Sequence, residues 1–301
     1  MISFERFTQY GRFGNQLFQY ALLRTTARKL DVPFYCPPWL GDEVFALDDA
    51  AERAGAPEGI RFHYRQPSEN CAFDPGVRSI VDHTDILGYF QSPQHFDGED
   101  ARRWFTFRPK VVALVREKYK GLDLTQCVGV HFRFGDIVNN TFYIELKADY
   151  YRRALASVQP YQKVLVFSDD PAAAREQMSG ITADFTVIEG NRNFEDLYLL
   201  TQCRAVVCSV STFSWWGAWL NDDPHRKVAA PREWLRPCQS VRNDGLNCPE
   251  WTNLRAAHRF HDSYKVMMAK QAWGERLARA RSRNMVQNLR TAAKLIVRRK
   301  R

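Results

Sequence analysis

The stretch Val128-Gly-Val-His-Phe-Arg-Phe-Gly-Asp136 decides how the rest of this chain is expected to fold. It begins within an apolar run, residues 127–130, that predicts a buried strand. The run then gives way to His131, Arg133 and Asp136, polar side chains that a buried strand does not favour. In open α/β sheets, ligands bind beyond the carboxyl ends of the strands. A cation, an imidazole and a carboxylate at such an end therefore predict a ligand site.

The second half of the chain repeats this strand-then-helix pattern. The expected strands are residues 127–132, 163–167, 185–188, 205–210 and 227–230. The expected helices are residues 149–158, a helix opened by Pro171, residues 194–203 and residues 215–220. Strands that alternate with helices at this spacing are typical of a parallel sheet with helical crossovers.

Polar clusters follow three of the expected strands. They are His131, Arg133 and Asp136; Ser168, Asp169 and Asp170; and Ser211, Thr212 and Ser214. Because parallel strands end at the same edge of their sheet, the three clusters predict one binding site. The third cluster also precedes a helix, whose free N–H groups and dipole suit a phosphate.

Each cluster also has a purely structural interpretation. Arg133 matches a phosphate bidentately, or it forms an ion pair with Asp136. His131 lines the site, or it is a hydrogen-bonded core imidazole. Asp169 and Asp170 bind a metal, cap the following helix, or accept the N–H groups of a nucleobase edge. Cysteine and histidine spacings typical of zinc sites are absent from the sequence, so we expect no structural metal.

The first half opens with a predicted strand, the turn Gly11-Arg-Phe-Gly-Asn-Gln16, a helix and a second strand at residues 32–36. This order is a βαβ start. Gly14, Asn15 and Gln16 are candidate contacts for a sugar or phosphate, although glycines also serve a tight turn. Residues 37–80 show no readable pattern.

A further strand is expected from Ile86, followed by a turn. Tyr89 and Gln91 in this turn are candidate sugar contacts or ordinary edge-strand residues. A helix opened by Pro109 leads to an expected boundary near residues 121–126. We therefore expect an N-terminal domain over residues 1–125, a second domain over residues 126–245 and a C-terminal helical segment over residues 246–301.

The positive charge of the chain is concentrated at its C-terminal end. The 301 residues carry a formal net charge of +9. The segment from Lys265 to the end holds twelve Lys or Arg residues and one acidic residue, so the preceding residues are close to neutral. In residues 275–301, apolar and basic side chains form two stripes of a predicted amphipathic helix, which suits an anionic membrane surface. A solvated tail is the alternative, and the near-neutral body speaks against nucleic-acid binding.

Composition also bears on the compartment. The seven cysteines have no regular spacing, and Cys203 and Cys208 adjoin apolar runs, where buried free thiols are expected. Free thiols fit a reducing compartment. Apolar runs long enough to cross a membrane are absent from the sequence, and so is the apolar core of a signal peptide. We expect a cytoplasmic protein, held peripherally at the inner face of the membrane by its tail.

Trp215, Trp216 and Trp219 are expected to pack in the core rather than to form a sugar platform.

Several motifs together resemble, in order, those of the α-1,2-fucosyltransferase family, glycosyltransferase family 11 of the bacterial type. The resemblance covers roughly residues 2–235. The motifs are Gly11-Arg-Phe-Gly-Asn-Gln-Leu-Phe-Gln-Tyr-Ala21, Gly88-Tyr-Phe-Gln-Ser92, His131-Phe-Arg-Phe-Gly-Asp136, Phe167-Ser-Asp-Asp170, Asn193-Phe-Glu-Asp-Leu197 and Ser211-Thr-Phe-Ser-Trp-Trp-Gly-Ala-Trp-Leu220.

The resemblance implies a GT-B glycosyltransferase with two Rossmann-like domains that face a cleft. It implies GDP-β-L-fucose as donor, inversion at the anomeric carbon and no metal ion. The donor site then lies in the second half, where Arg133 holds the β-phosphate and Asp169 or Asp170 reads guanine. The remaining implied contacts are Ser211, Thr212 and Ser214 at the phosphate and fucose, and Gly14, Asn15, Gln16, Tyr89 and Gln91 on the acceptor side.

Catalytic roles follow from the charge that develops during transfer. Arg133 is expected to stabilise the departing diphosphate, and His131 to line the site. Asp136 is the nearest candidate for the general base, although it can instead orient Arg133, and carboxylates of the first half remain candidates. The family pattern places a second arginine after the first, where this chain has Phe134. One cation fewer leaves the donor identity open.

The sequence therefore predicts an inverting, metal-independent transfer of L-fucose to the 2-hydroxyl of a galactose-type acceptor. The acceptor is expected to belong to a surface polysaccharide, a lipopolysaccharide or a related glycoconjugate, with lipid-linked glycans included. One alternative is the same fold with another nucleotide sugar. Another is a non-catalytic, membrane-associated protein that binds glycans. Acceptor identity and oligomeric state have no readable code in the sequence.

Overall fold

The computed structural model describes residues 1–67, 71–138, 140, 142–182, 184–236 and 245–256. These residues belong to one unit, Met1–Ala256. The predicted basic helix, and with it the membrane contact expected of residues 275–301, lies outside the described residues.

The first half of the unit contains a parallel four-stranded sheet in the order β2-β1-β4-β3. Its strands are β1 (Ile2–Ser3), β2 (Phe34–Tyr35), β3 (Phe62–Arg65) and β4 (Thr84–Leu87). The associated helices are α1 (Phe13–Leu30), α2 (Leu40–Val44), α3 (Gly98–Trp104) and α4 (Pro109–Lys118), with 3₁₀ turns η1 (Phe7–Gln9), η2 (Pro75–Ser79) and η3 (Pro93–His95). The strand β3 had no sequence pattern because it is an edge strand whose residues are mostly exposed.

The second half contains a parallel six-stranded sheet in the order β10-β9-β8-β5-β6-β7. Its strands are β5 (Cys127–Phe132), β6 (Lys163–Ser168), β7 (Phe185–Val187), β8 (Ala205–Val207), β9 (Lys227–Pro231) and β10 (Thr252–Leu254). The helices are α5 (Ala148–Ser157), α6 (Pro171–Ser179), α7 (Asn193–Gln202) and α8 (Thr212–Trp219), and η4 (Leu124–Gln126) precedes β5. All five strands expected in this half are confirmed. The short edge strand β10, which lies beyond residue 245, was not expected.

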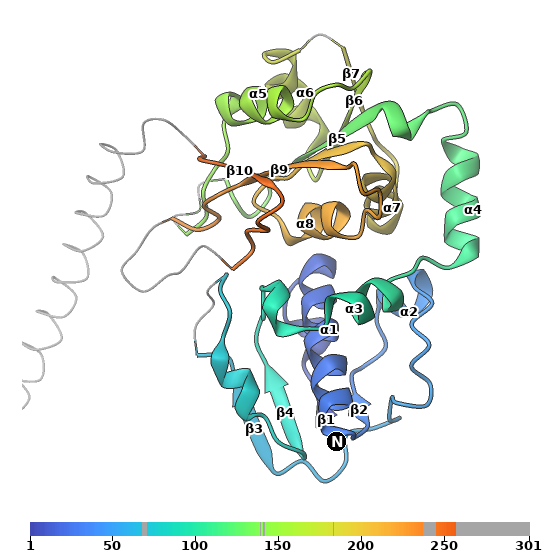
Figure 1. Cartoon of the computed structure of the whole chain (residues 1–301), viewed down its shortest axis with the longest axis vertical. Helices are drawn as coiled ribbons and strands as arrows, with labels where there is room; N and C mark the ends of the chain where they lie inside the picture. The colour runs from blue at the N-terminus through green and yellow to red at the C-terminus, as the bar shows by residue number, and fades with distance from the viewer. Residues whose placement is uncertain (68–70, 139, 141, 183, 237–244, 257–301) are drawn as a thin grey trace, which may run out of the picture. The chain divides into compact units, whose positions relative to one another are not determined.

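Helices cover both faces of the second sheet. Figure 1 shows α5 and α6 on one face and α7 and α8 on the other. This cover explains the apolar character of the central strand β5, in which all six residues are buried. The fold class expected from the sequence, an α/β protein with two parallel, Rossmann-like halves, is confirmed. The exact limits of the domains stay a prediction.

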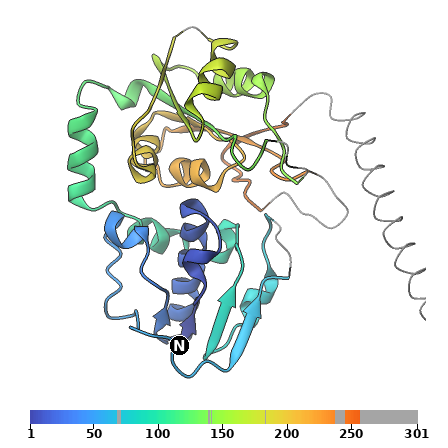
Figure 2. The ribbon, with the colours of Figure 1, turned by 180° about the vertical axis from the view of Figure 1, so that it is seen from behind.

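The helix α1 joins the two halves. In the front and rear views, α1 begins next to α8 of the second half and runs from there along the first sheet (Figures 1 and 2). Phe18 of α1 lies between Trp215 and Trp216 of α8, with ring centroids 4.8 Å from each. All three side chains are fully buried. The tryptophans of α8 are therefore core residues, as the sequence predicted.

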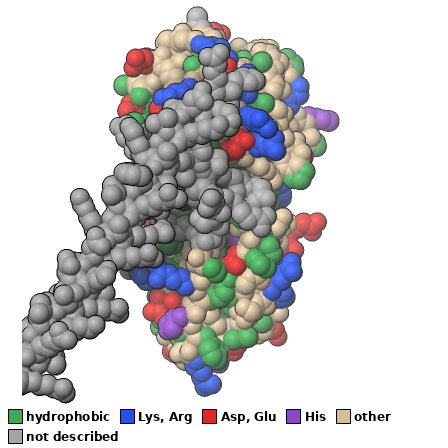
Figure 3. Space-filling view, turned by 90° about the vertical axis from the view of Figure 1, so that its left-hand side faces the viewer, with side chains coloured by type: hydrophobic (Ala, Val, Ile, Leu, Met, Phe, Trp, Pro, Cys, Tyr) green, Lys and Arg blue, Asp and Glu red, His purple; other side chains and the backbone are tan. Residues whose placement is uncertain are grey.

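Other features of the described residues agree with the composition. Cys203 and Cys208 are buried free thiols, as expected. Figure 3 shows acidic and basic side chains interspersed on the face that it presents, in keeping with a near-neutral body. Among the described residues, we find no helix with the length and apolar character needed to cross a membrane.

The position of Phe18 gives a first testable prediction. Replacing Phe18 by Ala opens a cavity between α1 and α8, and we expect the free energy of unfolding to fall by about 3–5 kcal/mol. Chemical denaturation measures the change. The control is Phe62→Ala in the edge strand β3, where the side chain is 52% exposed and the loss should stay below about 1 kcal/mol. Equal losses in the two variants would contradict the joining role of Phe18.

Candidate functional site

A cavity of about 520 Å³ lies where the two halves meet. The first half contributes Gly11, Arg12, Phe13, Gly14, Asn15, Cys71, Tyr89 and Gln91 to its lining. The second half contributes residues that follow β5, β6 and β8, residues at the start of α7, and Tyr143, Trp234 and Leu235. The three polar clusters predicted from the sequence thus converge on one site.

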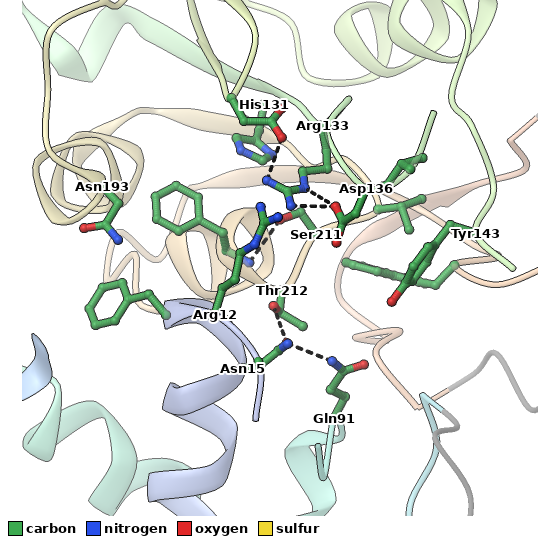
Figure 4. Close-up of a pocket in the computed structure, with 18 of the residues that line it drawn as sticks. Arg12, Asn15, Gln91, His131, Arg133, Asp136, Tyr143, Asn193, Ser211 and Thr212 are labelled. Atoms are coloured by element: carbon green, nitrogen blue, oxygen red, sulfur yellow. Dashed lines mark hydrogen bonds and ion pairs between the residues drawn. The ribbon is translucent and has the colours of Figure 1, made fainter. Parts of the chain in front are cut away.

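Two helices begin at this cavity. A side chain at Gly14, in the first turn of α1, would lie 2.6 Å from the backbone nitrogen of Phe213, so only glycine permits this approach to α8. The Oδ1 atom of Asn15 accepts hydrogen bonds from Nε2 of Gln91 and Oγ1 of Thr212, both 2.8 Å long (Figure 4). The free N–H groups and positive dipole ends of α1 and α8 are therefore held close together at the cavity.

Arg133 lies beyond the end of β5 and is held by two carboxylates. Its Nε and Nη2 atoms donate to Oδ1 of Asp136 at 3.0 and 2.6 Å, and its Nη1 atom lies 2.7 Å from Oδ2 of Asp169. The side chain is 15% exposed. The ion pair with Asp136 that the sequence left open is present, and Arg133 also lines the cavity. Its binding of a phosphate stays a prediction. Its orientation is fixed before any ligand binds.

Both carboxylate oxygens of Asp169 already have partners. Besides Arg133, it accepts a hydrogen bond of 2.9 Å from the backbone N–H of Phe134. A side chain at position 135 would lie 2.5 Å from Oδ2 of Asp169, which explains the glycine there. Both carboxylate oxygens are thus engaged, so Asp169 is poorly placed to read a nucleobase.

His131 is buried at the end of β5. Its Nδ1 atom shares a hydrogen bond of 2.7 Å with Oγ of Ser209, and its ring lies 5.5 Å from that of Phe213. Burial and the charge of Arg133 lower the pKa of His131 to about 3. The imidazole is therefore neutral at physiological pH, and it lines the cavity without adding a charge.

Asp136 is the most exposed of the predicted catalytic residues, with 51% of its side chain accessible. Burial of the carboxyl would raise its pKa, but the hydrogen bond and charge of Arg133, together with the charge of Arg12, outweigh this and lower it. Asp136 is therefore ionised at neutral pH and able to accept a proton.

Asp196 is a functional candidate that the sequence interpretation missed. It lines the cavity from the first turn of α7, beside Asn191 and Asn193. Nδ2 of Asn191 donates to its Oδ1 atom at 2.8 Å. Burial raises the pKa of Asp196 to about 6, although the bond from Asn191 lowers it. The motif from Asn193 to Leu197 was recognised, but the helical pattern gave Asp196 no visible role.

Three predicted site residues do not line the cavity. Asp170 caps α6 by accepting from the backbone N–H of Ala173 at 3.0 Å, the structural interpretation left open from the sequence. Ser214 is fully buried, and its hydroxyl accepts from the backbone N–H of Ser209 and donates to the carbonyl of Ser211. Gln16 turns back toward the carbonyl of Gly11. The other predicted residues, Gly14, Asn15, Tyr89, Gln91, His131, Arg133, Asp136, Asp169, Ser211 and Thr212, do line it.

A metal site needs several carboxylate, histidine or cysteine ligands close together. No group of three or more His, Cys, Asp or Glu side chains in those residues has the arrangement of a metal site. The carboxylates of the cavity instead face arginine and asparagine side chains.

Comparison with known proteins identifies the family. Residues 86–255 match the family described as glycosyl transferase family 11, so the chain belongs to this family. It also resembles the fold of solved GT-B fucosyltransferases. The apo form of POFUT1 aligns with a TM-score of 0.51 and 14% identity over 76% of this chain and 97% of that one. NodZ from Bradyrhizobium aligns with a TM-score of 0.50 and 17% identity over 72% and 90%.

Three relatives are similar in sequence. The O-antigen biosynthesis glycosyltransferase WbnK of Escherichia coli is 31% identical over 42% of this chain and 43% of its own length. The alpha-1,2-colitosyltransferase of Escherichia coli is 27% identical over 58% and 64%. Galactoside alpha-(1,2)-fucosyltransferase 2 of Oryctolagus cuniculus is 26% identical over 82% and 75%. The chain thus spans less than two thirds of the first two relatives.

The close approach at Gly14 gives a second prediction. Gly14→Ala should lower the free energy of unfolding by about 1–3 kcal/mol, because the new methyl group meets the backbone of α8. Helix propensity alone predicts the opposite sign, a gain of up to about 1 kcal/mol. The control is Gly55→Ala, where nothing lies within 4 Å of the added atom. A stabilised Gly14→Ala protein in thermal and chemical denaturation would refute this contact.

The buried histidine gives a third prediction. Since His131 has a pKa of about 3 in the folded protein and an ordinary value near 6.5 when unfolded, the unfolded chain binds the extra proton between these values. Stability should therefore fall as the pH decreases through this window, by about 2 kcal/mol between pH 7 and pH 5. Replacement by Gln removes this contribution, so the variant should lose less stability over the same interval. If the free energy of unfolding fell equally with pH in the wild type and in the variant, His131 would not titrate in this way.

Proposed function

We propose that the protein transfers L-fucose from GDP-β-L-fucose to the 2-hydroxyl of a galactose-type acceptor, with inversion and without a metal ion. Membership of glycosyl transferase family 11 supports the reaction class. The observation that carries the proposal is the cavity itself. It combines Arg133 with the N-termini of α1 and α8, an arrangement suited to a diphosphate, and it leaves an ionised carboxylate beside them.

The diphosphate binds next to Arg133 and the first turn of α8. Ser211 and Thr212 line this part of the cavity, and the N–H groups of the turn suit phosphate oxygens. Negative charge grows on the leaving GDP as the bond between sugar and phosphate breaks. Because Asp136 and Asp169 already hold the guanidinium in place, Arg133 meets this charge with little reorganisation.

Guanine binds at Asp196 rather than at Asp169 or Asp170. Asp169 is engaged by Arg133 and by a backbone N–H, and Asp170 caps α6. Asp196 is half-buried at the cavity, where one carboxylate oxygen accepts a hydrogen bond from the amide of Asn191. The edge of guanine presents two adjacent N–H donors, which a carboxylate accepts well.

Asp136 acts as the general base. It is ionised and half exposed, and it lines the cavity. The acceptor hydroxyl attacks the anomeric carbon from the face opposite the diphosphate in a single displacement, and its proton passes to Asp136. Tyr89, Gln91 and Asn15 line the cavity from the first half and contact the acceptor sugar.

The acceptor is a galactose-containing glycan of a surface polysaccharide or related glycoconjugate. The names of two relatives, an O-antigen biosynthesis glycosyltransferase and a galactoside fucosyltransferase, support this class. A second candidate function is the same transfer with colitose. It is favoured by the relative named alpha-1,2-colitosyltransferase, and the absence of a second arginine at position 134 leaves the donor identity open.

The basic segment over residues 275–301 attaches the protein to an anionic membrane surface at the cytoplasmic side, where lipid-linked acceptors are available. Its charge and its two-stripe pattern support this part of the proposal. Flotation with anionic liposomes tests it. The full-length protein should float with the liposomes, and a chain ending at residue 264 should not. Equal flotation of the two proteins would refute the membrane attachment.

Transfer itself tests the proposed function most simply. Purified protein is incubated with GDP-fucose, or in a parallel series with GDP-colitose, and with a panel of β-galactosides, with and without EDTA. The linkage is read by NMR. We expect an α-1,2 bond to galactose at a rate that EDTA does not change. Transfer of colitose but not of fucose would favour the second candidate, and transfer of neither would refute both.

The pKa of Asp196 gives a prediction for the base site. Only the ionised carboxylate accepts both N–H groups of guanine, so the dissociation constant of GDP should rise as the pH falls below about 6. The rise should approach about tenfold per pH unit. Asp196→Asn should bind GDP more weakly at pH 7.5 and lose this pH dependence. An unchanged pH profile in the variant would place guanine elsewhere.

A further inference from the structure

The charges that line the cavity indicate that a bound diphosphate needs a second cation besides Arg133. The lining includes three carboxylates, Asp136, Asp169 and Asp196, and two arginines, Arg12 and Arg133. Arg133 is bound by two of the carboxylates, so that cluster has a net negative charge. A diphosphate approaching this cluster is repelled unless other positive groups face it. Helix dipoles supply only about half a charge each.

Arg12 is placed to supply that charge. It is the N-cap of α1, and its side chain forms no capping hydrogen bond. Among the described residues, no hydrogen bond or ion pair is found for its exposed guanidinium. Figure 4 shows this guanidinium beside that of Arg133, reaching the site from the first half. Two guanidinium groups that line one cavity, one of them without an ion pair in the described part of the chain, form a suitable site for an anion.

The position after Arg133 cannot contribute this charge. Phe134 stacks on Phe132, with centroids 6.0 Å apart and ring planes inclined by 9°. Phe132 in turn stacks on Tyr151 at 4.0 Å. The residue that follows Arg133 is thus part of an aromatic stack. The additional cation must come from another segment, and Arg12 is the cavity residue that provides it.

We propose that Arg12 is the second donor-binding cation. It binds the diphosphate from the first half, while Arg133 binds it from the second. This inference rests on the proposed function and deepens it. The donor site is then shared between the two halves, whereas the sequence interpretation placed it in the second half alone. The bound diphosphate closes a bridge between α1 and the loop after β5.

Charge-assisted hydrogen bonds of this kind have a large effect on affinity. Loss of one is expected to weaken binding of the ligand by about ten- to a hundredfold. The effect should depend on the second phosphate, because Arg12 reaches the diphosphate from the first half and Arg133 from the second. A nucleoside monophosphate offers them a smaller and less charged ligand.

The test compares GDP and GMP binding to the full-length protein by isothermal titration calorimetry. In Arg12→Ala, the dissociation constant of GDP should rise by about ten- to a hundredfold and that of GMP by less than about threefold. Arg12→Lys retains the charge and should recover part of the loss. The control is Arg6→Ala, which removes an exposed arginine of the same half that does not line the cavity, and should bind both nucleotides as the wild type does.

Two results would overturn the role of Arg12. One is wild-type GDP affinity in Arg12→Ala, and the other is an equal loss for GDP and GMP. Thermal melting of each variant confirms the fold, which an exposed N-cap without a capping bond should not disturb.

A parallel titration with ADP separates this inference from the proposed function. If the wild type binds ADP as tightly as GDP, and both depend on Arg12, the guanine assignment fails and the role of Arg12 stands. If the wild type prefers GDP and Arg12→Ala binds it unchanged, the role of Arg12 fails and the proposed donor stands. Failure of the wild type to bind any nucleoside diphosphate would refute both.

Discussion

The contact between the first turns of α1 and α8 is the interaction on which the rest of the site depends. Gly14 brings the helices together at backbone distance, and Asn15 accepts hydrogen bonds from both halves. One turn further along α1, Phe18 fills the space between Trp215 and Trp216. The walls of the cavity are therefore held by a continuous buried core, which favours a site that is formed before the ligand arrives.

Electrostatics at this site follow from the same arrangement. Arg133 is held by Asp136 and Asp169, and a glycine at position 135 makes room for the second of these carboxylates. In the proposed reaction, an oriented guanidinium and two helix N-termini face the place where negative charge develops. Catalysis of glycosyl transfer relies on such preorganised groups, because they stabilise the leaving group without rearrangement.

The second-half fold was predictable because strands covered by helices on both faces are continuous apolar runs. The converging clusters were predictable because parallel strands share one edge. The exposed edge strand β3 lacked any such pattern. Contacts between distant segments were also hidden. The sequence alone allowed Asp169 to bind a nucleobase. In the structure, its two carboxylate oxygens instead bind Arg133 and the backbone N–H of Phe134. Likewise, Arg12 and Asp196 became candidates only through their place in the cavity.

A crystal structure of the protein with GDP bound tests the central claim most directly. The claim is that the cavity between the two halves binds a nucleoside diphosphate at the adjoining N-termini of α1 and α8. We expect the diphosphate between Arg12 and Arg133, and the guanine edge against Asp196. A nucleotide bound outside this cavity, or a base at the opposite end beside Tyr143 and Trp234, would contradict the account.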